Sequence, residues 1–127
     1  MKLAIVEDDL IIQMFLERVA SSIHFDVVGT ASDHEQAINL IETTDPDVVL
    51  LDIGIRGSVD GIDTAKVIRE RFDIPYLFMS GNTDTKTHER AISTDPIGFI
   101  TKPIDEFSLK NQLLKIKTTL EKVVDSN

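Results

Sequence analysis

The sequence predicts an α/β protein: a doubly wound, three-layer sandwich with a five-stranded parallel sheet between two layers of helices. Apolar runs of strand length alternate with amphipathic stretches of helix length along the 127 residues, and each parallel crossover needs a helix. The strand runs are apolar throughout, as in Val48 to Leu51, which burial on both faces of a sheet requires. No linker, repeat or low-complexity stretch interrupts this alternation. We therefore expect a single domain over residues 1–127.

The strand predictions rest on five short runs that are largely β-branched, aliphatic or aromatic. In chain order the predicted strands are Leu3 to Val6, Val27 to Gly29, Val48 to Leu51, Tyr76 to Met79 and Gly98 to Thr101. The carboxyl ends of parallel strands lie at one edge of a sheet, which is where such folds bind their ligands. That edge is the place to look for a site.

The first three helices are predicted from periodicity and from start signals. Leu10 to Ser22 carries apolar residues at helical spacing on one face. The second helix begins at the capping-box pattern Ser32-Asp33-His34-Glu35. The third follows Asp60-Gly61, with Asp60 in the N-cap region.

The last two predicted helices differ sharply in how clearly their sequences show the apolar spacing of an amphipathic helix. Thr83 to Ile92 is polar and Thr-rich, so we expect a short and mobile helix there. The fifth helix starts at Asp105 and repeats apolar residues from Leu109 to Val123 at spacings of four and three. That spacing is typical of a helix that covers a sheet.

Composition excludes several classes of protein. The chain has no Cys, which removes disulfide frameworks, thiol nucleophiles and Cys-based zinc sites. Its net charge of −9 argues against direct nucleic-acid binding through phosphate contacts. The absence of Cys also favours a reducing, cytoplasmic setting. No apolar run approaches the ~20 residues of a membrane span, so we expect no membrane partner. The acidity is uneven: residues 1–63 hold 13 acidic and three basic side chains, whereas residues 64–127 hold nine and ten.

Polar and charged residues follow four of the predicted strands: Glu7-Asp8-Asp9, Asp52, Ser80 and Lys102-Pro103. Each of them alone has an ordinary structural explanation, such as a helix cap or a surface lysine. Together, carboxylates from adjacent strand ends repel unless a cation joins them, and Mg²⁺ suits oxygen ligands and phosphate. A carboxylate, a metal, a lysine and a hydroxyl at one point are the groups that phosphoryl transfer uses. Asp52 follows the most central apolar strand and is therefore the best-fixed candidate for the nucleophile.

These motifs resemble the receiver domain of two-component response regulators, the CheY-like family. The similarity covers essentially the whole chain and is carried by Val6-Glu7-Asp8-Asp9, Val49-Leu50-Leu51-Asp52-Ile53-Gly54, Asp60-Gly61, Phe78-Met79-Ser80-Gly81 and Gly98-Phe99-Ile100-Thr101-Lys102-Pro103. It implies a sheet in the flavodoxin-like strand order 2-1-3-4-5.

The resemblance also implies a role for each site residue. Asp52 would accept a phosphoryl group from the phosphohistidine of a sensor histidine kinase or a histidine phosphotransfer protein. The Mg²⁺ ligands would be Glu7, Asp8, Asp52 and the backbone carbonyl of Gly54. Lys102 would pair with phosphoryl oxygens. Ser80 would donate a hydrogen bond to the phosphoryl group, and Phe99 would be the aromatic residue that turns inward with it.

The resemblance further implies a signalling switch and not a general enzyme. The surface of the fourth helix, fifth strand and fifth helix would bind an unknown downstream protein. We expect a stand-alone receiver, although the polar end Asp125-Ser126-Asn127 also suits the start of a linker in a longer regulator. The long last helix makes a homodimer a secondary hypothesis.

Three departures from the family's common pattern leave the phosphate lifetime open. The loop from Asp52 to Asp60-Gly61 is about one residue longer than usual and lacks the frequent proline, Gly54 has no side chain, and Asn82 occupies the other tuning position.

Two other functions stay open as alternatives, and a third, flavin binding, is disfavoured by the acidic residues after the first strand. A Mg²⁺-dependent phosphatase that forms an aspartyl phosphate wants a second Asp two residues after the nucleophile, where this chain has Gly54. A degenerate interaction module, which no longer accepts phosphate, would not need the complete set of site residues that this chain has: Glu7, Asp8, Asp52, Ser80 and Lys102. A flavin-binding protein would want a hydroxyl- and glycine-rich loop in place of Glu7-Asp8-Asp9. The three histidines, His24, His34 and His88, have no ligand spacing and are predicted to be surface or partly packed residues.

Overall fold

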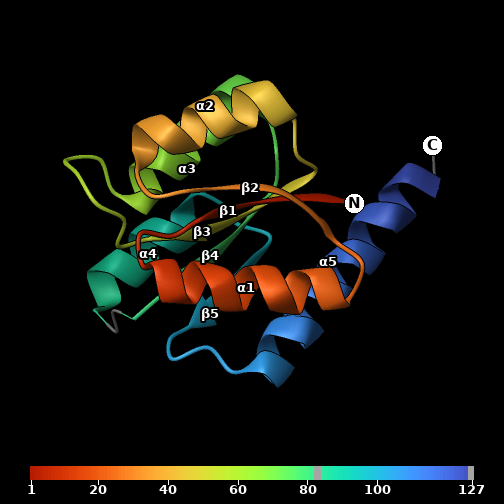
Figure 1. The fold of residues 1–127 in the computed structure, drawn as a ribbon. Coiled ribbons are helices and arrows are strands. Elements are labelled where there is room, and N and C mark those ends of the chain that lie inside the picture. Colours follow the sequence, from red (N-terminus) through yellow and green to blue (C-terminus); the bar gives the residue numbers. More distant parts are fainter. Residues whose placement is uncertain (82–83, 126–127) are drawn as a thin grey trace.

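The computed structural model describes residues 1–81 and 84–125, with side chains up to Lys122. Within them five strands and five helices alternate (Figure 1). Their bounds are β1 Lys2–Val6, α1 Leu10–Ser22, β2 Asp26–Ala31, α2 His34–Thr44, β3 Val48–Asp52, α3 Gly61–Phe72, β4 Tyr76–Ser80, α4 Thr85–Ser93, β5 Gly98–Thr101 and α5 Glu106–Asp125. All strand pairs are parallel and the order is β2-β1-β3-β4-β5. The predicted fold class and strand order are confirmed.

The sheet separates two apolar layers, as Figure 1 shows with α2 and α3 on one side and α1 and α5 on the other. Alternate strand residues enter each layer because successive side chains point to opposite faces. In β3, Val49 and Leu51 pack toward α2 and α3, whereas Val48 and Leu50 pack toward α1 and α5. The apolar runs of the central strands are therefore explained by burial on both faces.

Aspartates begin the helices. The carboxylates of Asp9, Asp33, Asp60 and Asp84 accept hydrogen bonds from backbone N–H groups in the first turns of α1 to α4. Asp105 does the same for α5, accepting from the Ser108 N–H at 2.7 Å. Such caps satisfy donors that have no partner inside the helix. Since each helix follows a parallel strand, all five caps lie at the edge where the strands end.

The start of α2 corrects one detail of the prediction. The capping box placed the cap at Ser32 with Glu35 as its partner, but Asp33 is the N-cap and accepts from the Gln36 N–H at 2.8 Å. Gln36 in turn accepts from the Ser32 N–H at 3.0 Å. Ser32 and Asp33 are both good caps, so local preference does not decide between them. The whole pattern is shifted by one residue.

Helix α4 is short, as predicted, although it begins at Thr85 and not at Thr83. Among its described residues only Ala91 is buried. Polar links hold it instead: Arg90 pairs with Asp60 at 3.4 Å and with Asp63 at 3.6 Å, at the start of α3. After the helix, the Tyr76 hydroxyl donates to the Thr94 carbonyl at 2.7 Å. The expected mobility of α4 stays a prediction.

Arg90→Gln is expected to loosen α4 with little effect on the rest of the fold. Exposed ion pairs contribute about 0.2–1 kcal/mol each, and Arg90 makes two of them, so global stability should fall by no more than about 2 kcal/mol. Local opening of α4 should increase because so little apolar burial opposes it. Hydrogen exchange followed by mass spectrometry should show faster exchange in α4 than in the parent. Arg18→Gln, which removes the Arg18–Glu106 pair between α1 and α5, is the control, and equal effects in α4 would contradict the prediction.

Helix α5 buries the seam that its spacing predicts, with Leu109, Leu113 and Ile116 against the sheet. The predicted continuation to Val123 lies outside the described side chains. Phe107 and Leu114 are exposed on α5, and the homodimer stays a prediction. None of the helices in the described part of the chain has the length and apolar character needed to cross a bilayer.

Candidate functional site

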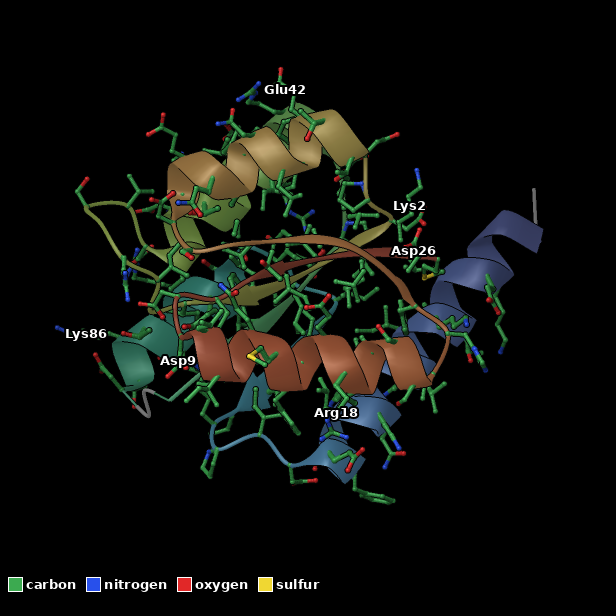
Figure 2. The ribbon with its side chains drawn as sticks, viewed as in Figure 1. Lys2, Asp9, Arg18, Asp26, Glu42 and Lys86 are labelled. Atoms are coloured by element: carbon green, nitrogen blue, oxygen red, sulfur yellow. The ribbon has the colours of Figure 1, made fainter. Side chains whose placement is uncertain are left out.

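The predicted site residues converge at the carboxyl edge of the sheet. Figure 2 shows Asp9 and Lys86 at this end of the molecule, with Lys2 and Asp26, where β1 and β2 begin, at the other. A cavity of about 330 Å³ opens there. Its lining comes from the ends of β1, β3 and β4, the start of α1 and the residue after β5: Glu7, Asp8, Asp9, Ile12, Asp52, Ile53, Gly54, Ser80, Gly81 and Lys102. The rule that ligands bind beyond the carboxyl ends of parallel strands therefore applies here.

Three carboxylates face one another in the cavity. One oxygen from each of Glu7, Asp8 and Asp52 lies within 4.8 Å of the other two. Glu7 is 0% exposed and Asp52 is 4% exposed, whereas Asp8 is partly exposed. Hard cations such as Mg²⁺ prefer a set of oxygen donors of this kind. The donor chemistry therefore fits the predicted metal.

Lys102 places its ammonium between two of these carboxylates. Its Nζ is 3.2 Å from Glu7 Oε2 and 3.2 Å from Asp52 Oδ2. Burial lowers the pKa of Lys102, but attraction to Asp52 and Glu7 outweighs burial and raises the pKa above its ordinary value. The lysine is therefore held as a cation beside the predicted nucleophile.

Glu7 has the most perturbed carboxyl group of the site. Burial, followed by its hydrogen bond and repulsion with Asp52, raises the pKa of Glu7 from 4.5 to about 7, against the opposing effect of Lys102. Between pH 4.5 and 7, Glu7 is therefore protonated in the folded protein without a metal ion, whereas it is ionised in the unfolded chain. The raised pKa of Glu7 contributes fully to the free energy of unfolding below pH 4.5, and this contribution is lost as the pH rises through 7.

Glu7→Gln should consequently flatten the pH dependence of stability in the absence of metal. We expect the melting temperature of the parent in EDTA to fall between pH 5 and pH 8, and that of the variant to fall less. Thermal unfolding followed by circular dichroism measures both. Glu42→Gln, a change at an exposed carboxylate of α2, should keep the slope of the parent. Equal slopes for the parent and Glu7→Gln would refute the linkage.

Asp52 is fixed by the backbone around it. It is the last residue of β3, and its Oδ1 accepts from the Gly54 N–H at 3.1 Å. The next residue, Ile53, donates its N–H to the Met79 carbonyl at 3.0 Å and accepts from the Gly61 N–H at 2.8 Å. The start of α3 thus packs directly on the end of β3. A carboxylate held this way has little freedom to leave the cavity.

Ser80 and Phe99 lie on the same face of the sheet. Ser80 ends β4 at the cavity and is buried, and in the β4–β5 pairing it lies beside Thr101, two residues from Phe99. The Phe99 ring is partly buried and contacts Phe78 and His88, with ring centroids 6.3 and 4.8 Å away. The two predicted switch residues therefore lie on one face of the sheet, with Ser80 at the cavity and Phe99 against α4. Asn82 lies outside the described residues.

Two residues at the site were missed by sequence reasoning. Gln13 of α1 is buried and donates hydrogen bonds to the Glu7 carbonyl and, at 3.4 Å, to Ser32 Oγ. Its only sequence signal is an amide among the apolar positions of an amphipathic helix. Arg56, from the loop after β3, pairs with Asp8 at 3.8 Å. No sequence signal connects these two residues, because a long loop brings them together.

The three histidines lie apart from one another and are surface or partly packed residues, as predicted: His24 and His88 are exposed and His34 is partly buried. His34 Nδ1 is 2.8 Å from Thr64 Oγ1, between α2 and α3. His88 contacts Phe99 from α4. His24 follows α1 in a turn with a φ of 69°.

Comparisons with known proteins agree with this geometry. The heme response regulator HssR of Staphylococcus saprophyticus is 28% identical over 118 residues, which are 93% of this chain and 50% of that protein. A protein-glutamate methylesterase/protein-glutamine glutaminase of Bacillus subtilis is 34% identical over 128 residues, which cover 97% of this chain and 35% of that protein. The signal receiver domain of a modulated diguanylate cyclase from Desulfovibrio desulfuricans G20 superposes with a TM-score of 0.86 at 27% identity, covering 99% and 98% of the two chains. The chain spans about half the length of the first curated relatives it matches.

The family model described as the response regulator receiver domain matches residues 3–114. That span includes all the predicted site residues, from Glu7 to Lys102, and the whole sheet except Lys2 at the start of β1. This chain therefore belongs to the receiver domain family of two-component response regulators.

Proposed function

We propose that this chain is a phosphorylation switch whose Asp52 accepts a phosphoryl group from a phosphohistidine, with Mg²⁺ bound beside it. The phosphohistidine would belong to a sensor histidine kinase or a histidine phosphotransfer protein. One observation carries the proposal: a buried carboxylate lies 3.2 Å from a lysine ammonium in a cavity that two further carboxylates line. A nucleophile, a cation and a set of metal ligands are thereby within reach of one phosphoryl group.

The metal would be held by Glu7, Asp8 and Asp52, with the backbone carbonyl of Gly54 as a further ligand. These donors suit Mg²⁺, which takes few carboxylates and keeps water ligands. When bound, Mg²⁺ supplies positive charge that offsets the charge on the phosphoryl oxygens.

The residues of the chain carry the transfer. A carboxylate oxygen of Asp52 attacks phosphorus, so that an O–P bond forms while the P–N bond to the donor imidazole breaks and its electron pair stays on that nitrogen. The Gly54 N–H orients the Asp52 carboxylate during the attack. Lys102 stabilises charge on the phosphoryl oxygens through charge-assisted hydrogen bonds. Catalysis of this kind is mainly positioning and electrostatic stabilisation.

The response would pass through Ser80 and Phe99 to the surface of α4, β5 and α5. A phosphoryl group on Asp52 adds negative charge at the cavity to which Ser80 can donate a hydrogen bond. Phe99 is on the same face and contacts α4 through His88. Because α4 buries so little and is held by polar links, it is a suitable bistable element. A downstream protein would bind this surface, and a homodimer through α5 stays a prediction.

An apolar patch beside the cavity is a suitable docking surface for the phosphohistidine protein. Leu10, Ile11 and Met14 of α1 are exposed. A second, apolar cavity of about 510 Å³ adjoins the site, because Ile12 and Lys102 line both. Any protein that delivers a phosphoryl group to Asp52 has to cover this region.

Met14→Glu is expected to slow transfer from a phosphohistidine protein by about tenfold or more, since a charge buried in an apolar contact costs over 1.4 kcal/mol. Labelling by a small acyl phosphate should be unchanged, because that donor needs no docking surface. The donor protein is found by screening sensor kinases for transfer to the parent. Ile92→Glu, at an exposed apolar residue of α4, is the control. Equal slowing of both donors by Met14→Glu would rule out docking at this patch.

The proposal is tested by incubation with Mg²⁺ and a small acyl phosphate, followed by intact mass measurement. We expect one phosphoryl adduct, formed only when a divalent cation is present. Steady turnover of a separate phosphate ester would favour the Mg²⁺-dependent phosphatase, which the Gly54 position disfavours. Absence of any adduct would favour the degenerate interaction module. The single receiver domain over residues 1–127, the stand-alone state and the cytoplasmic location stay predictions.

A further inference from the structure

Arg56 is a charged residue at the site to which the proposed function gives no role. It lies in the loop between β3 and α3, and its Nε is 3.8 Å from Asp8 Oδ2. The side chain of Arg56 is 75% exposed and that of Asp8 is 26% exposed. Lys102, in contrast, contacts carboxylates that are almost fully buried. The Arg56–Asp8 pair is therefore at the solvent side of the carboxylate cluster.

The fold fixes the backbone that carries this arginine. Ile55, the preceding residue, is buried in the core between the sheet and the helices α2 and α3. Arg56 itself forms a parallel bridge with Asp33, the cap of α2. The loop is therefore attached at two consecutive positions. Its attachment keeps the arginine beside Asp8.

Each carboxylate of the cluster has a basic partner. Lys102 pairs with Glu7 and Asp52, and Arg56 pairs with Asp8. Arg56 is one of only three basic residues in the first 63 positions, where 13 acidic residues lie. The positive charges of Lys102 and Arg56 thus reduce the repulsion among the three carboxylates, as a bound divalent cation would. A cation that binds at Asp8 has to compete with the guanidinium.

We propose that Arg56 is a displaceable counterion of Asp8 that sets the affinity of the carboxylate cluster for divalent cations. This inference rests on the proposed function, because it concerns the same metal site. A divalent cation needs an oxygen of Asp8 and is repelled by the guanidinium at short distance, so the two bind Asp8 in competition. Exposed ion pairs are weak. Removing the arginine should therefore tighten cation binding by about two- to fivefold and not by orders of magnitude.

The test is a calorimetric titration of the full chain with Mg²⁺ at low ionic strength, repeated with Mn²⁺ followed by electron paramagnetic resonance. Arg56→Gln should bind both cations about two- to fivefold more tightly than the parent. Arg56→Lys, which keeps the charge, should stay close to the parent. In 1 M salt, where the screening length is about 3 Å, the difference between Arg56→Gln and the parent should shrink.

Arg71→Gln is the matched control. Arg71 pairs with Glu42 at 3.8 Å, the same distance as the Arg56–Asp8 pair, but between α3 and α2. The substitution changes the net charge by the same amount and should leave the affinity for either cation unchanged. An equal shift in Arg56→Gln and Arg71→Gln would show an effect of net charge alone and would overturn the inference.

Thermal unfolding provides a second measurement. With EDTA, Arg56→Gln should unfold at or slightly below the temperature of the parent. With a subsaturating Mg²⁺ concentration, its gain in melting temperature should be larger, because tighter binding to the folded state stabilises more. Unchanged affinity in Arg56→Gln, with clear binding by the parent, would overturn the role of Arg56 and leave the proposed function intact. No cation binding by the parent, or binding that survives Asp8→Asn, would overturn both.

Discussion

Asp52→Asn is expected to take up no phosphoryl group under conditions in which the parent is labelled. An amide oxygen is a far weaker nucleophile than a carboxylate and cannot form the acyl phosphate. Asn has nearly the same size, and the Gly54 N–H that donates to Asp52 Oδ1 can donate to the amide oxygen. The fold should therefore be retained. Intact mass after incubation with Mg²⁺ and a small acyl phosphate measures the loss directly.

Asp26→Asn is the control for that experiment, because Asp26 is an exposed residue at the start of β2, at the opposite edge of the sheet. It should be labelled like the parent. Circular dichroism of Asp52→Asn should match the parent, so that a loss of labelling is not a loss of folding. An adduct of equal size on Asp52→Asn would mean that another residue is labelled, and the proposed function would fail.

Gly61→Ala is expected to destabilise the fold by about 3 kcal/mol or more, at the upper end of what overpacking costs. A Cβ at Gly61 would lie 2.1 Å from the Asp52 carbonyl oxygen and 2.6 Å from the Ile53 Cα. Both are backbone atoms, of Asp52 at the end of β3 and of the residue after it, so there is no side chain that could move aside. Urea unfolding measures the change in free energy. The position of Asp52 should also shift, so labelling should be slower in any folded fraction.

Gly54→Ala is the control for stability. Its Cβ would come no closer than 3.9 Å to Asp52 Oδ1, and we expect a change within about 1 kcal/mol, as for an ordinary surface substitution. If Gly61→Ala were as stable as Gly54→Ala, the close packing of α3 on the end of β3 would be wrong.

The sequence predicted the structure best where a single local rule is sufficient to assign an element. Apolar runs predict the strands because a strand buried on both faces admits few polar residues. β2 is longer than predicted because it is an edge strand, and polar residues such as Asp26 and Thr30 are tolerated at its ends. The strand order came only from the resemblance, since alternation alone does not specify which strands are neighbours.

At the site, the residues at or directly after the carboxyl ends of strands were predictable and the others were not. Glu7, Asp52 and Lys102 converge because parallel strands end at one edge. Gln13 and Arg56 reach the site from a helix face and a loop, and their partners are set by tertiary packing. The shifted cap of α2 has the same origin, because Ser32 and Asp33 are equivalent by local preference.

The five capping aspartates also shape the electric field around Asp52. Each carries a full negative charge, whereas the helix N-terminus it caps carries only about half a positive charge. Five such caps add negative charge along one edge, in addition to the charges of Glu7, Asp8 and Asp52. Serine and asparagine cap helices nearly as well as aspartate but are neutral. Cap identity is therefore a means of tuning how readily anionic donors approach, one charge at a time and with the fold preserved.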